Sequence, residues 1–126
     1  MANKYLVITH SGPEDPGRAT TAFKVAKNLV DKGEDVSIFL LNNAVYLMIE
    51  ESQEHVQAPG SPPFEDYFLF LTMTKKIPIY IGEFCSIGRG LRDEKGNPKV
   101  KFSYGEIAGS DKLTELIIEA DKILSI

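Results

Sequence analysis

Apolar residues in the first third of the chain change from one spacing to another and back. Residues 5–9 (YLVIT) form a short, nearly continuous apolar run, which is typical of a buried strand in a parallel sheet. Apolar positions at residues 16–32 then recur every three or four residues and predict an amphipathic helix, which Asp15 caps and Gly33 ends. Residues 36–41 (VSIFLL) predict a second strand. Strand, helix and strand in this order indicate a right-handed parallel unit and an α/β fold.

The rest of the chain continues this alternation. Residues 44–51 predict a short helix, and a polar, proline-containing loop follows. Residues 64–76 fit either a strand or a helix, but their length and the buried strand expected at 77–81 favour a helix. A last amphipathic helix, capped by Ser110, precedes a final strand at 122–126. These elements predict a three-layer α/β/α sandwich with a mainly parallel sheet.

Composition narrows the class of protein. The chain has 126 residues, of which 43% are hydrophobic and 25% are charged, and this suits a single globular domain over residues 1–126. A net charge of −4 with scattered basic residues argues against a nucleic-acid binder. A single cysteine allows no internal disulfide, and the apolar runs are too short for a signal peptide or a membrane span. We therefore expect a cytoplasmic protein without membrane association.

Candidate site residues follow the expected strands. His10 and Ser11 come after the first strand, Asn42 and Asn43 after the second, and the segment 82–90 (GEFCSIGRG) after the third. Ligands of parallel sheets gather outside the carboxyl ends of the strands, so we expect these loops to converge on a pocket. His10 could act there as a base or ligand, although a single histidine at a strand end is more often structural.

Cys85 is the residue with the most reactive side chain in this set. It lies where a helix could begin, so backbone N–H groups and the positive end of a helix dipole would face its sulfur. Arg89, one helical turn later, adds a positive charge. Both features favour the thiolate, which is the nucleophilic form. A free cysteine is also commonly a small buried hydrophobe, and the local sequence leaves both interpretations open.

Other kinds of site have little support. Two distant histidines and one cysteine lack the ligand spacing of a zinc site, so we expect no metal. The turn THSGPEDPG matches neither of the glycine patterns that bind phosphate, and Glu14 and Asp15 would repel an anion. A flavin or nucleotide site is therefore weakly supported, and we expect no cofactor.

Several segments of the chain together resemble the DsrE/DsrF-like family, and within it the small YchN-like members. The similar segments are YLVITHSGPEDPGRATTAFKVAKNL, IFLLNNAVYLM, CSIGRG and EIAGSDKLTELIIEADKILSI. The resemblance implies a three-layer sandwich with a mainly parallel five-stranded sheet, and assembly into homotrimers or hexamers. It also implies a sulfur carrier, in which a cysteine accepts sulfane sulfur as a persulfide from a donor protein and passes it to an acceptor.

For this chain, the resemblance implies that Cys85 holds the sulfane sulfur. Arg89 and the backbone of the turn through Ser86 and Gly88 would then stabilise the thiolate. Gly82 stands where carriers of the DsrE type have their cysteine, and Cys85 matches a second position three residues later. Two functions therefore stay open. One is a sulfur-relay protein, or sulfurtransferase, and the other is a non-catalytic oligomeric binding or scaffold protein.

Overall fold

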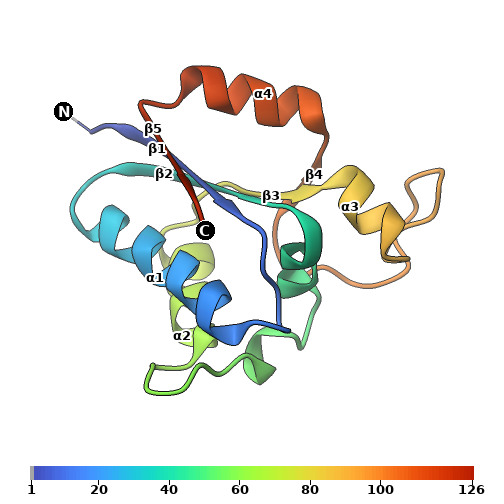
Figure 1. Cartoon of the computed structure of the whole chain (residues 1–126), viewed down its shortest axis with the longest axis horizontal. Coiled ribbons are helices and arrows are strands. Elements are labelled where there is room, and N and C mark those ends of the chain that lie inside the picture. The colour runs from blue at the N-terminus through green and yellow to red at the C-terminus, as the bar shows by residue number, and fades with distance from the viewer. Residues whose placement is uncertain (1) are drawn as a thin grey trace.

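The computed structural model describes residues 2–126, and its centre is a five-stranded sheet with the strand order β4-β3-β2-β1-β5 (Figure 1). Every neighbouring pair in this sheet is parallel. The strands are β1 (Lys4–Thr9), β2 (Asp35–Leu40), β3 (Ile79–Gly82), β4 (Glu106–Ala108) and β5 (Lys122–Ser125). The expected α/β class and the mainly parallel five-stranded sheet are confirmed.

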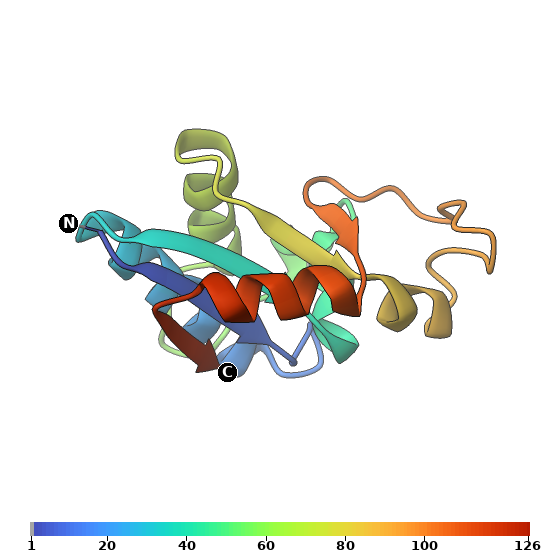
Figure 2. The same cartoon turned by 90° about the horizontal axis from the view of Figure 1, so that it is seen from above.

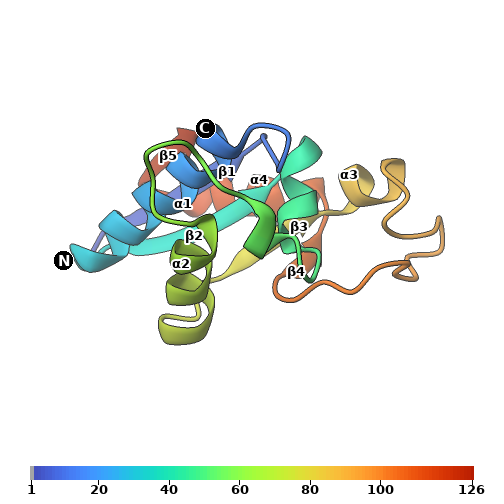
Figure 3. The ribbon, with the colours of Figure 1, turned by 90° about the horizontal axis from the view of Figure 1, so that it is seen from below.

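Helices cover both faces of the sheet and make the three layers. The α-helices are α1 (Pro16–Asp31), α2 (Phe64–Leu69), α3 (Glu83–Gly88) and α4 (Ser110–Glu119). Shorter turns are the 3₁₀ helices η1 (Asn42–Met48) and η2 (Gln53–His55), and the π-helical turn η3 (Phe70–Thr74). Figures 1 and 3 show α1 and α2 on one face, and α4 on the other. Across residues 2–126, no helix is both long and apolar enough to cross a membrane.

The first helix forms as its sequence predicts. The Asp15 carboxylate accepts the Arg18 N–H at 3.2 Å, which satisfies a backbone donor that the helix leaves unpaired at its start. Pro16 occupies the first helical position, and Gly33 adopts a φ of +86° just beyond the end, a left-handed conformation suited to glycine. The buried face carries Ala19, Ala22, Phe23 and Ala26, which pack against the sheet.

Some boundaries differ from the sequence prediction. The helix expected over residues 64–76 forms over 64–74, with its last turn widened into the π-helical turn η3, and β3 begins at Ile79 instead of residue 77. The prediction that Ser110 caps α4 is wrong, because the Leu113 N–H donates to the Gly109 carbonyl and Gly109 is therefore the cap. The pattern also missed β4, since three residues are too few to show a period.

The two faces of the sheet bury unequal amounts of apolar surface. The larger core lies under α1, η1 and α2. The core under α4 holds the buried side chains Leu6, Phe39 and Ala108, with half-buried residues around them. Figure 2, seen from above, shows α4 crossing this face. Ile118 on the outer side of α4 is 78% exposed, so apolar surface remains uncovered on this side of the molecule.

Candidate functional site

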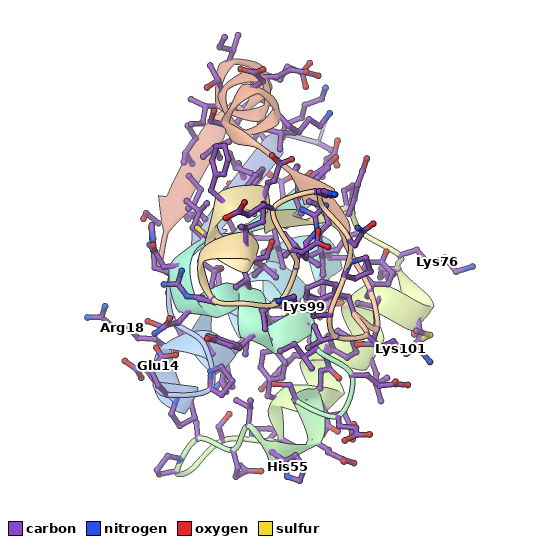
Figure 4. All side chains as sticks on the ribbon, turned by 90° about the vertical axis from the view of Figure 1, so that its right-hand side faces the viewer. Glu14, Arg18, His55, Lys76, Lys99 and Lys101 are labelled. Atoms are coloured by element: carbon purple, nitrogen blue, oxygen red, sulfur yellow. The ribbon has the colours of Figure 1, made fainter. Side chains whose placement is uncertain are left out.

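The carboxyl ends of the parallel strands meet at one edge of the sheet. His10 follows β1, Asn42 follows β2, and α3 follows β3 directly. Figure 4 looks toward this edge and shows α3 between α4 above and η1 below. The convergence of the loops expected from the sequence is therefore present in the structure.

Cys85 is half-buried in α3, and its sulfur accepts a hydrogen bond from a neighbouring loop. The Asn42 backbone N–H lies 3.1 Å from Cys85 Sγ. Asn42 has a φ of +52°, a left-handed conformation that asparagine tolerates better than most residues. The sequence predicted amide donors from the turn that contains Cys85, whereas this donor comes from the end of β2. This hydrogen bond fixes the position of Sγ against the loop after β2.

A chain of side-chain hydrogen bonds leads away from Asn42 across the sheet edge. Asn42 Nδ2 lies 3.0 Å from His10 Nδ1, and His10 Nε2 lies 3.1 Å from Ser125 Oγ. Since Nδ2 can only donate, Nδ1 accepts, and in the neutral ring the proton is on Nε2 and is donated to Ser125. The chain ties together the ends of β1, β2 and β5. His10 is therefore held by a hydrogen bond at each ring nitrogen, and its expected role as a base or ligand stays a prediction.

Ser125 is a site residue that the sequence did not indicate. It pairs with Ile8 in the register of β5 against β1, which places its side chain beside the residue following β1. The strand order reverses between β1 and β5, the kind of position where open α/β sheets often bind ligands. In this protein the bond between His10 and Ser125 bridges that position. A serine in a terminal strand gave no signal, because its significance depends on which strand lies beside it.

Arg89 joins α3 to η1. Its Nε donates to Asn43 Oδ1 at 2.8 Å, and its Nη1 donates to the Cys85 carbonyl at 3.3 Å. The guanidinium therefore lies against the last turn of a helix, where a positive charge is favoured by the helix dipole. Arg89 therefore holds α3 against η1, and its hydrogen bond to Cys85 is to the carbonyl oxygen.

The remaining predicted residues lie apart from this network. Ser86 is fully buried, and its hydroxyl donates to the Glu83 carbonyl at 2.8 Å within α3. Gly88 is exposed at the end of the same helix, and Ser11 is half-buried in the turn after His10. The structure thus brings together His10, Asn42, Asn43, Cys85 and Arg89 from the predicted set, and it does not join Ser86 or Gly88 to them.

Gly82, three residues before Cys85, lies close to the backbone of β2. A Cβ added at Gly82 would lie 3.0 Å from the Leu40 carbonyl oxygen and 3.4 Å from Cys85 Cβ. A side chain at position 82 would therefore require the Leu40 carbonyl to move by a few tenths of an ångström. Cys85 is the one cysteine of the chain, so it carries the one thiol at this edge.

A wide hollow lies on the other side of Asn43. Its volume is about 420 Å³, and Pro13, Tyr46, Ile49 and His55 are among the residues that line it. It is open and partly apolar, which suits the end of a flexible ligand better than a tightly held cofactor. Within residues 2–126, no three His, Cys, Asp or Glu side chains gather closely enough to hold a metal ion.

Comparison with known proteins gives the family. The model of the DsrE/DsrF-like family matches residues 3–126, so the chain belongs to this family, which is associated with sulfur relay in general. Among solved structures, the crystal structure of the ychN protein from E. coli aligns over 100% of both chains, with a TM-score of 0.73 and 21% sequence identity. This likeness confirms the shared fold. None of the curated proteins compared matches this chain.

Proposed function

We propose that this protein is a sulfur carrier that holds sulfane sulfur as a persulfide on Cys85 and exchanges it with a partner protein. The observation that carries the proposal is the Asn42 N–H directed at Cys85 Sγ at 3.1 Å, in a chain of a family associated with sulfur relay. The thiol is half-buried at the edge where the strands end, so a partner can reach it. The transfer needs no cofactor.

The proposed chemistry is an exchange between a thiol and a persulfide. The Cys85 thiolate attacks the terminal sulfur of a donor persulfide, forming a new S–S bond while the donor's own S–S bond breaks. The donor leaves as a thiolate and takes up the proton that Cys85 released. The exchange is balanced without an external oxidant or reductant. Asn42 and the charge of Arg89 stabilise the attacking sulfur before the bond forms.

Mass spectrometry of the intact protein tests this proposal. After brief incubation with inorganic polysulfide and removal of the excess, we expect the protein to gain sulfur on Cys85 and to lose it on reduction. Cys85→Ser should gain none, whereas His55→Ala, an exposed change away from α3, should gain as much as the native chain. A native protein that stays unmodified, although its thiol is alkylated without unfolding, would contradict the proposal.

We propose further that the carrier works in the cytoplasm as a homo-oligomer, a trimer or hexamer as the family resemblance implies. A carrier thiol must stay reduced between transfers, which a reducing compartment ensures. Exposed apolar side chains support association, since Ile118 is 78% and Ile123 is 44% exposed.

The second candidate is a non-catalytic binding or scaffold protein. The 420 Å³ hollow beside Asn43 favours it, because a small molecule or a partner's tail would fit there without contact with the sulfur. The Cys85→Ser variant separates the two candidates. A scaffold with this change would still bind its partner, whereas a carrier with this change would no longer transfer sulfur.

A further inference from the structure

A small apolar hollow opens beside Cys85 on the α4 side of the sheet. Its volume is about 130 Å³, and Cys85 forms part of its wall. The apolar lining comes from β2 and the residue after it, α3, β4 and α4, with the side chains of Phe39, Leu41, Phe84, Ala108 and Leu113. Elements from distant parts of the chain thus build one hollow around the reactive atom.

The size of the hollow suits a single side chain. An apolar cavity of about 150 Å³ in another protein holds a benzene molecule, so this one can accept a leucine, methionine or phenylalanine side chain. Phe84 stands next to Cys85 in the chain and is 75% exposed, which is unusual for so large an apolar residue. An exposed aromatic ring at the rim of an apolar hollow is typical of a surface that a partner covers.

The charge around the hollow restricts its occupant. Glu83 is the one charged residue among the described residues that line the hollow. A carboxylate at the rim repels anionic ligands, such as glutathione persulfide with its carboxylates, and favours neutral or basic peptides. The apolar lining and the acidic rim together indicate a peptide segment rather than a small anionic thiol.

We propose that this hollow is the subsite for an apolar side chain next to the persulfide-bearing cysteine of a donor protein. The inference depends on the proposed function and specifies its partner. In the transfer, each S–S bond is about 2 Å long, so the donor's cysteine sulfur lies within about 4 Å of Cys85 Sγ. A side chain one residue away from that cysteine then reaches the hollow. Its burial holds the reacting sulfur atoms in position, as catalysis by proximity requires.

Two synthetic peptides with blocked ends test the subsite. Both carry a persulfidated cysteine between small residues, and one has leucine where the other has glycine immediately before the cysteine. We expect the leucine peptide to load Cys85 about tenfold faster, the ratio that burial of one leucine side chain provides. Phe84→Ala should lower this ratio severalfold. Ile118→Ala, which removes a similarly exposed side chain that does not line the hollow, should leave it unchanged.

The outcomes separate the subsite from the proposed function. If polysulfide loads Cys85 but both peptides load it equally, or not at all, the subsite is wrong and the carrier function stands. A preference that survives Phe84→Ala in full would also overturn the subsite. If neither polysulfide nor either peptide loads Cys85, both the carrier function and the subsite are wrong. Since Phe84 is exposed, its replacement should leave the fold intact, which circular dichroism checks.

Discussion

At the scale of single residues, Gly12 fixes the distance between the turn after β1 and the start of η1. A Cβ built on Gly12 would lie 2.0 Å from the Asn43 carbonyl oxygen, far closer than any real contact. The Gly12 N–H also donates to the Glu14 carboxylate at 2.9 Å, which holds the turn in this place. The Asn43 side chain accepts a hydrogen bond from Arg89, which follows α3. The close approach of Gly12 to Asn43 therefore helps to set the position of α3 as well.

Gly12→Ala should therefore destabilise the protein, because the backbone of η1 must move to admit the methyl group. We expect the free energy of unfolding in urea to fall by about 2 kcal/mol, as overpacking of a tight contact typically causes. Gly88→Ala is the matched control. Its added Cβ meets nothing within 4 Å, and alanine favours a helix, so stability should stay equal or rise slightly. Equal stability of both variants would show that the contact at Gly12 relaxes without cost.

The sequence predicted which residues lie together at this edge, because they follow the ends of strands within a few residues. His10, Asn42 and Cys85 could be grouped from the chain order alone, since parallel strands end at a common edge. What could not be predicted was which atoms meet. The donor at Cys85 Sγ depends on the left-handed backbone of Asn42, and the role of Ser125 depends on the place of β5 beside β1. Neither leaves a trace in local composition.

At the scale of elements, the long connection between α3 and β4 is organised by one aspartate. Asp93 Oδ1 accepts the backbone N–H groups of Lys95 and Asn97 at 2.9 and 2.8 Å, and Oδ2 accepts the Asn97 side-chain amide at 3.0 Å. Gly96 takes a φ of +89° within this turn, a conformation suited to glycine. The hydrogen bonds from Asn97, its backbone first and then its side chain, lower the pKa of Asp93 below the ordinary value of 3.8.

This lowered pKa predicts how the turn responds to acid. The folded carboxyl group holds its proton less tightly than the unfolded one, so its stabilising effect is complete above the ordinary value. It is lost as the pH falls below 3.8 through the folded pKa. An NMR titration of the Asp93 side chain should show a midpoint below 3.8, with amide exchange of Lys95 and Asn97 quickening at the same pH. Asp93→Asn should remove this pH dependence. A midpoint at or above the ordinary value would contradict the prediction.

The segment that the sequence left ambiguous and the strand that it missed share a physical cause. Phe64 to Lys76 has apolar residues at both strand and helix spacing, and only its packing against α1 selects the helix, as the close contact of Phe23 with Phe64 shows. The three residues of β4 become a strand because β3 offers an open edge to pair with. Long periodic elements such as α1 are specified locally, whereas short ones are specified by their neighbours.

At the scale of the whole molecule, the two faces of the sheet are covered unequally. On one side α1, α2 and the 3₁₀ turns bury a large core, while on the other α4 covers a small one and exposes Ile117, Ile118 and Ile123. A chain of 14.0 kDa that leaves this much apolar surface on one side is expected to cover it by association. The proposed homo-oligomer therefore predicts that the α4 side forms a subunit contact.

Sedimentation velocity tests this prediction in solution. The native protein should sediment as a multiple of 14.0 kDa, and Ile118→Asp should shift it toward the monomer, because a buried unpaired carboxylate costs several kcal/mol. Met73→Asp is the control, since Met73 is 58% exposed but belongs to η3, the turn that continues α2. A native monomer would contradict the oligomer. Dissociation by Met73→Asp but not by Ile118→Asp would move the contact to the α2 side.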